Sequence, residues 1–139
     1  MKLTLTILTV ATTLFASSAS AFDPDDLQKL KDTGDCVECD LSGADLPSLV
    51  GTDLSAADLR KADLSGAYLA LFYLIKVDLR GADLSRADIS EAVLIDADLR
   101  GANLSGADLF GSDLRQAIMN GVILCNTTMP DGSKIYSGC

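Results

Sequence analysis

A large apolar residue recurs at every fifth position through most of this chain of 139 residues. From Thr52 to Met129, each unit has a small residue, then usually Asp or Asn, then Leu, Ile or Met, then two variable positions. Five steps of about 100° rotate each apolar residue by about 140°, so an α-helix would have no apolar stripe. A straight strand is also excluded, because an odd period alternates the two faces. The chain must therefore turn a corner at every repeat.

Four repeats form one coil, because the similar segments ADLRKADLSGA, VDLRGADLSRA and ADLRGANLSGA begin at residues 57, 77 and 97. In an extended segment the small and the central residue point the same way. If both point inward, each repeat is one wall of a stacked solenoid. Eighteen repeats predict four to five coils, roughly 20 Å tall at about 4.8 Å per coil. Their centres, with a three-residue slip at PSLVG after the second, are Leu41, Leu46, Leu54, Leu59, Leu64, Leu69, Leu74, Leu79, Leu84, Ile89, Leu94, Leu99, Leu104, Leu109, Leu114, Met119, Leu124 and Met129.

The A(D/N)LXX units between residues 39 and 129 resemble the pentapeptide repeat family. That resemblance implies an all-β solenoid, a right-handed quadrilateral parallel β-helix. The end segments CVECDLSGADL and CNTTMPDGSKIYSGC are similar to those of small exported or thylakoid-lumenal members of cyanobacterial type. The family includes quinolone-resistance proteins that mimic DNA and bind gyrase, whereas most members have no assigned biochemical activity.

Residues 1–21 are typical of a secretory signal peptide cleaved before Phe22. Lys2 precedes an apolar run, and Ala19-Ser20-Ala21 supplies the small residues of a cleavage site. We therefore expect export to the periplasm or a thylakoid lumen. The intact chain has 11 basic and 20 acidic residues, and loss of Lys2 changes its net charge from −9 to −10. Such a charge disfavours binding to nucleic acid and, after cleavage, to anionic membranes.

The two ends of the predicted β-helix have different sequence signals. In residues 22–38, Asp23 suits a helix N-cap, Pro24 the first helical position and Gly34 the exit, which predicts a short helical cap. Leu27 and Leu30 would cover the first coil. Residues 130–139 form a C-terminal tail that we expect a disulfide to close.

Four cysteines, two near each end, allow three pairings. A disulfide requires Cα atoms within about 7 Å, so ends roughly 20 Å apart cannot be joined. We therefore predict the bonds Cys36–Cys39 and Cys125–Cys139, formed after export. The same separation excludes a four-cysteine zinc site in one chain. The short Cys36–Cys39 loop is expected to make that bond the more reducible of the two.

The composition does not favour an enzyme. Histidine is absent, which removes the usual general acid or base at neutral pH and the commonest metal ligand. Flat walls filled with Leu and Ala also provide no concave pocket for convergent catalytic groups. We expect no catalytic residues, no cofactor and no metal.

One stretch of the repeats, AYLALFYLIKVDL at residues 67–79, loses its aspartates. The 20-residue period stacks outward-facing Tyr73 on Val93, and Ile75 on Ile95. Lys76 and Asp96 are expected to frame them with an ion pair, while Phe72 takes an inward position that normally holds a small residue. An exposed apolar surface is typical of a contact site. The predicted patch, hereafter the apolar patch, comprises Tyr68, Leu71, Tyr73, Ile75, Val93 and Ile95.

Three functional hypotheses follow. The preferred one is an exported, non-enzymatic scaffold whose flat β faces and apolar patch bind an unknown protein partner or a second copy as a homodimer; improved stacking alone is the simplest alternative for the patch. The second is a DNA-mimicking topoisomerase-binding inhibitor, which the acidic charge favours and the predicted export disfavours. The third is a redox-responsive lumenal protein acting through Cys36–Cys39.

Overall fold

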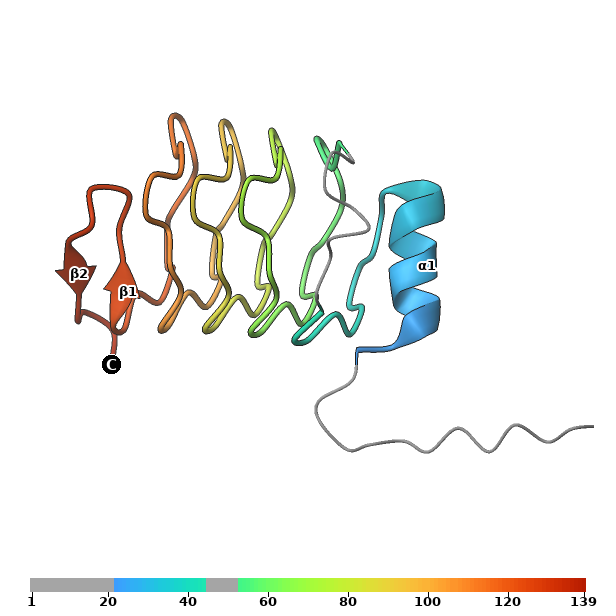
Figure 1. Ribbon diagram of the computed structural model, residues 1–139, viewed down its shortest axis with the longest axis horizontal. Helices are drawn as coiled ribbons and strands as arrows, with labels where there is room; N and C mark the ends of the chain where they lie inside the picture. Colours follow the sequence, from blue (N-terminus) through green and yellow to red (C-terminus); the bar gives the residue numbers. More distant parts are fainter. Residues whose placement is uncertain (1–21, 45–52) are drawn as a thin grey trace, which may run out of the picture.

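The computed structural model describes residues 22–44 and 53–139 (Figure 1). The predicted signal peptide, the repeat centred on Leu46 and the PSLVG segment lie outside the described residues. In the described part, successive coils stack along one axis, with a helix at one end and a small hairpin at the other. A rod built of coils is the architecture that the five-residue period predicts.

Parallel β-bridges join residues 20 positions apart, as in Tyr68–Asp88, Tyr73–Val93 and Asp78–Asp98. One bridge follows another at five-residue steps, which gives four walls in each coil. The exception is Asp40–Asp63, whose separation of 23 residues contains the three-residue slip. In each coil a wall contributes only one residue to its ladder of bridges, so the solenoid consists of isolated bridges rather than long strands.

The core is a stack of the central apolar residues and the small residues of the repeats. From Leu54 to Leu109 every central residue is at most 2% exposed. Phe72, in place of a small residue, is also buried, as predicted. Each buried Leu contributes about 1.5–3 kcal/mol against an ordering cost of about 1–2 kcal/mol per residue. Stability therefore depends on many stacked repeats together.

The corners are turns that require a left-handed residue. In the turn after Leu79, for example, the N–H of Ala82 donates to the Leu79 carbonyl over 3.0 Å, and Gly81 has φ of 68°. This is the pattern of a type II turn. Ten described residues other than glycine also adopt positive φ at corners, including Leu71 at 67°. A positive φ is costly for a residue with a side chain, and the ladders on both sides of each corner hold it in place.

Helix α1, Pro24–Thr33, lies against the N-terminal end of the solenoid (Figure 1). The Asp23 side chain accepts from the N–H of Asp25, and Gly34 ends the helix at φ of 73°, both as the sequence predicts. Leu30 is 1% exposed and Leu27 packs partly against the core. A carboxylate oxygen of Asp26 accepts from the N–H of Asp40 over 2.8 Å, which links helix and coil. Across residues 22–44 and 53–139, α1 is too short to cross a bilayer, and no longer apolar helix occurs.

The ends of the solenoid differ in detail from the predicted boundaries. The ladder already includes residue 36, because the N–H of Cys36 donates to the Asp58 carbonyl over 2.7 Å. At the other end, β1 (Thr127–Thr128) and β2 (Lys134–Ile135) pair as an antiparallel hairpin. This hairpin, which was not predicted from the sequence, folds the tail back along the last coil.

Candidate functional site

The aspartate before each central residue has a structural task that the sequence analysis missed. Its side chain accepts a hydrogen bond from the backbone N–H two residues later, an arrangement hereafter called the Asx cap. The Asp83 carboxylate accepts from Ser85 over 2.9 Å, and the Asn103 amide oxygen accepts from Ser105 over 3.0 Å. Asp and Asn favour this local bond, so their alternation at one repeat position was the available signal. The acidic residues therefore stabilise the fold as well as charging the surface.

One wall of the solenoid neutralises its own charges. Asp58, Asp78 and Asp98 alternate on it with Arg60, Arg80 and Arg100. Each arginine forms a fork with the aspartate of its own repeat and lies 3.7–3.8 Å from the next aspartate where one follows. The arginine hydrogen bonds lower the pKa of all three carboxyls, although desolvation opposes this shift. These charges are occupied within the wall, so they are poor candidates for a ligand site.

The apolar patch lies where the sequence predicts it. Asp53, Tyr73, Val93 and Asp113 follow one another by parallel bridges along one wall. Tyr73 is 55% exposed, while Val93 is half-buried. Ile75 and Ile95, two residues after these, are also half-buried. The wall is therefore apolar across two consecutive coils.

The patch continues around a corner. Tyr68 is 44% exposed on the neighbouring wall, and Leu71, at the corner, is 60% exposed. Next to Ile95, a shallow hollow is lined by Arg115 and Gln116. The surface thus combines exposed apolar side chains with an open hollow beside them, which suits a macromolecular contact better than an enclosed small molecule.

Loss of the aspartates also leaves backbone donors without an Asx cap. The backbone N–H groups of Ile75 and Ile95 donate no hydrogen bond to any residue in the part of the chain that the structure describes. The predicted ion pair at this wall is wrong: Lys76 and Asp96 lie one coil apart, but no salt bridge joins them among the described residues. Both are corner residues with positive φ, and a separation of one coil does not bring their charged groups into contact.

Other exposed apolar residues were not predicted. Ile118 and Ile123 are 42% and 40% exposed at positions where the repeat normally has Asp. That substitution was visible in the sequence. Phe110 is exposed as well, on the same wall as Tyr68 but two coils further along. All three residues lie outside the apolar patch.

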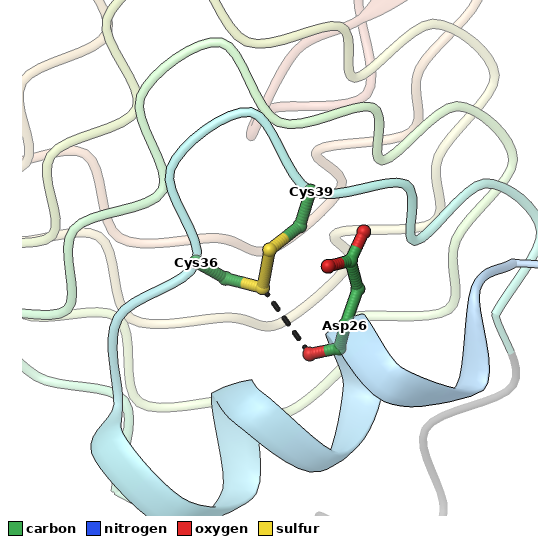
Figure 2. A group of neighbouring side chains, drawn as sticks. All are labelled: Asp26, Cys36 and Cys39. Atoms are coloured by element: carbon green, nitrogen blue, oxygen red, sulfur yellow. Dashed lines mark hydrogen bonds between the residues drawn. A yellow bond between two sulfur atoms is a disulfide. The ribbon is translucent and has the colours of Figure 1, made fainter.

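The N-terminal cysteines form the predicted disulfide beneath helix α1 (Figure 2). Cys36 is 0% and Cys39 2% exposed. The Cys36 sulfur lies 3.2 Å from the backbone oxygen of Asp26, a contact that is not a true hydrogen bond because a disulfide sulfur carries no proton. The Asp26 carboxylate and both sulfurs lie within 4.8 Å of one another. While the bond is closed, the sulfurs are not thiolate ligands, so this group cannot act as a metal site.

The C-terminal cysteines also pair as predicted, with Cys125 and Cys139 Cα atoms 4.8 Å apart. Cys139 is exposed and Cys125 half-buried. This bond closes the tail that contains the β1–β2 hairpin. Of the two disulfides, the C-terminal one is thus the more accessible to a reductant in solution.

Four walls of stacked five-residue units define a class of protein, the quadrilateral parallel β-solenoid. The model of pentapeptide repeats matches eight copies at residues 35–71 and 73–106, about half of the chain. The chain belongs to the pentapeptide repeat family, whose members form right-handed quadrilateral β-helices and are generally not enzymes. No protein of curated function matches the sequence.

Several solved structures of pentapeptide repeat proteins are similar to parts of this chain. HetL of the cyanobacterium Nostoc sp. strain PCC 7120, involved in heterocyst differentiation regulation, is 42% identical over 68% of this chain and 40% of its own, with a TM-score of 0.43. A protein of the Arabidopsis thaliana thylakoid lumen is 31% identical over 70% of both chains, with a TM-score of 0.33. A protein of the cyanobacterium Cyanothece 51142 is 27% identical over 70% of this chain and 92% of its own, with a TM-score of 0.39. The chain thus spans less than half of the length of HetL.

Proposed function

We propose that this protein is an exported, non-enzymatic scaffold that binds another protein through the apolar patch. The observation that carries the proposal is the exposure of Tyr68, Leu71 and Tyr73 on two adjoining walls and the corner between them. Soluble proteins rarely expose large contiguous apolar patches, and those that they do expose are typical of contact sites. The helix α1 acts in this proposal as a lid over the first coil, because it buries Leu30 against the core.

Export is part of the same proposal. It is supported by the signal-like sequence of residues 1–21 and by the pairing of all four cysteines, since disulfides persist in oxidising compartments. The topoisomerase-binding alternative gains no specific support, because arginine forks neutralise the aspartates Asp58, Asp78 and Asp98 that stack along one whole wall. The redox alternative is weakened by the burial of Cys36–Cys39 beneath α1.

The test is affinity capture from the exported fraction of the source cells, with the chain from residue 22 as bait. A Tyr73→Ser/Ile95→Ser variant is the comparison, because it removes apolar surface without adding charge. We expect a protein that the wild type retains and the variant loses. An Ile118→Ser/Ile123→Ser variant is the matched control, because it removes two exposed isoleucines from other walls.

Circular dichroism and thermal unfolding must first show that both variants fold as the wild type does. Equal recovery of every protein by wild type and by the Tyr73→Ser/Ile95→Ser variant would contradict the proposal. Loss of a partner in both variants would show a general stickiness of exposed apolar residues rather than a defined site.

A further inference from the structure

We infer that the partner at the apolar patch is a basic protein segment, one that places an apolar anchor on the patch and cationic side chains around it. This inference rests on the proposed function, to which it adds the chemistry of the partner. The supporting observation is that carboxylates border the patch and form no salt bridges with the described residues.

Four carboxylates surround the patch. Asp53 is bridged to Tyr73, and Asp88 to Tyr68. Glu91 is one coil beyond Leu71 in the same corner column, since the N–H of Leu71 donates to the Ser90 carbonyl. Asp96 directly follows Ile95 in the sequence.

None of these four carboxylates forms a salt bridge with the described residues. Fewer cationic side chains than carboxylates lie near the patch. Lys76 is the corner residue after Ile75, and Arg86 lies at the far corner of the wall that holds Tyr68 and Asp88. Arg115 is already engaged by Asp113 at 2.7 Å. The border of the patch is therefore negative, in contrast to the self-neutralised Asp58 wall.

This arrangement favours a basic occupant over a second copy of the chain. Two copies meeting through the patch would bring like-charged borders together, in addition to the repulsion between chains whose net charge is −9 intact and −10 without Lys2. A cationic segment would pair with carboxylates that form no salt bridge among the described residues, although Asp53 and Asp88 also accept hydrogen bonds in their Asx caps. Asp53 and Glu91 are exposed, and Asp88 and Asp96 are only half-buried. Because such border charges remain in contact with solvent, we expect them to govern the association rate and the choice of partner more than the total affinity.

The test uses two fluorescein-labelled synthetic peptides that share a leucine–tryptophan core, one flanked by lysines and the other by glutamates. Binding to the folded chain is measured by fluorescence anisotropy. We expect the lysine-flanked peptide to bind at least about tenfold more tightly, and its affinity to fall as the salt concentration rises.

The decisive variant is Asp88→Asn/Glu91→Gln/Asp96→Asn, which should weaken the lysine-flanked peptide by about tenfold. Asn at position 88 preserves the Asx cap, as Asn103 already does. The matched control is Asp40→Asn/Asp63→Asn/Asp83→Asn, which removes an equal number of charges from the wall opposite the one that holds Tyr73 and Val93. That control should lose no more than a small part of the affinity.

Each other outcome overturns a defined claim. If the glutamate-flanked peptide binds as tightly, or if both charge variants act alike, the basic partner is wrong while the contact site stands. If Tyr73→Ser/Ile95→Ser binds the lysine-flanked peptide like wild type, the proposed site is wrong as well. If neither peptide binds at millimolar concentration, the inference fails. If sedimentation shows a dimer that Tyr73→Ser/Ile95→Ser dissociates, the occupant is a second copy.

Discussion

The carboxylate of Asp98 accepts a hydrogen bond of 3.2 Å from the backbone N–H of Arg100 and another of 2.8 Å from its guanidinium. The Asp98 side chain therefore stabilises the backbone turn and also pairs with the charged group of Arg100. Replacement of Asp98 by Ala should lower the free energy of unfolding by about 1–2 kcal/mol, because it removes the Asx cap and the arginine fork together. Urea unfolding of the variant checks this value. Asp98→Asn, which keeps an acceptor, should lose less, and an equal loss would show that the fork alone matters.

The forked aspartates predict a loss of stability in acid. Hydrogen bonds from Arg60, Arg80 and Arg100 lower the pKa values of Asp58, Asp78 and Asp98 below the ordinary value of 3.8. A carboxyl with a lower pKa in the folded state stabilises it above the unfolded pKa. This contribution disappears as the pH falls through the folded-state pKa values.

The melting temperature should therefore be level from about pH 7 to 5 and fall steeply below about pH 4. Thermal unfolding followed by circular dichroism across this range measures the effect. An Arg80→Gln/Arg100→Gln variant should show a shallower fall, because its carboxyls lose the arginine hydrogen bonds. An unchanged acid limb in that variant would contradict the assignment.

The two disulfides should open in the order that their exposure dictates. The short loop of Cys36–Cys39 predicts easy reduction, but its sulfurs are buried beneath α1, whereas Cys139 is exposed. We expect dithiothreitol under native conditions to open Cys125–Cys139 first, as detected by alkylation and peptide mass mapping. Leu30→Ala should accelerate labelling of Cys36 and Cys39, because it loosens the helix over them. Early labelling of Cys36 in the wild type would instead revive the redox hypothesis.

Leu71 should be less stabilising than glycine at its own position. It is 60% exposed and has φ of 67°, a conformation that costs a residue with a side chain about 1 kcal/mol. Leu71→Gly is expected to raise the free energy of unfolding by up to about 1 kcal/mol while it weakens partner binding. Ala56→Gly, at a corner with φ of 60°, is the control that should gain stability without affecting binding. A destabilised Leu71→Gly variant would show that Leu71 packs for the fold.

A core leucine provides the scale for these effects. Leu84 is 0% exposed and stacks with the leucines of the coils on either side. Leu84→Ala should cost about 2–5 kcal/mol, measured by urea unfolding. A cost below 1 kcal/mol would indicate that the solenoid can collapse around the lost methyl groups.

The coil of four repeats, the inward leucines and the pairing of the cysteines could all be predicted from the amino-acid sequence. These features follow from a short period that is repeated many times. The direction of one side chain, such as that of Leu84, can therefore be inferred from the same position in all the other repeats. The sequence also predicted the three-residue slip, which reappears as the separation of Asp40 and Asp63. The position of the apolar patch was equally predictable, because the period assigns Tyr73 and Val93 to one wall.

The contacts between coils and at the two ends could not be predicted in this way and required the three-dimensional packing. The tertiary structure showed that Asp83 caps a backbone N–H, that Lys76 does not pair with Asp96, that Cys36 is sealed under α1 and that the tail folds back as a hairpin. The physical reason is that periodicity fixes which residues share a wall, whereas side-chain reach, corner geometry and end packing fix their contacts. These contacts depend on how the whole chain stacks, so they cannot be predicted from the spacing of residues along the sequence.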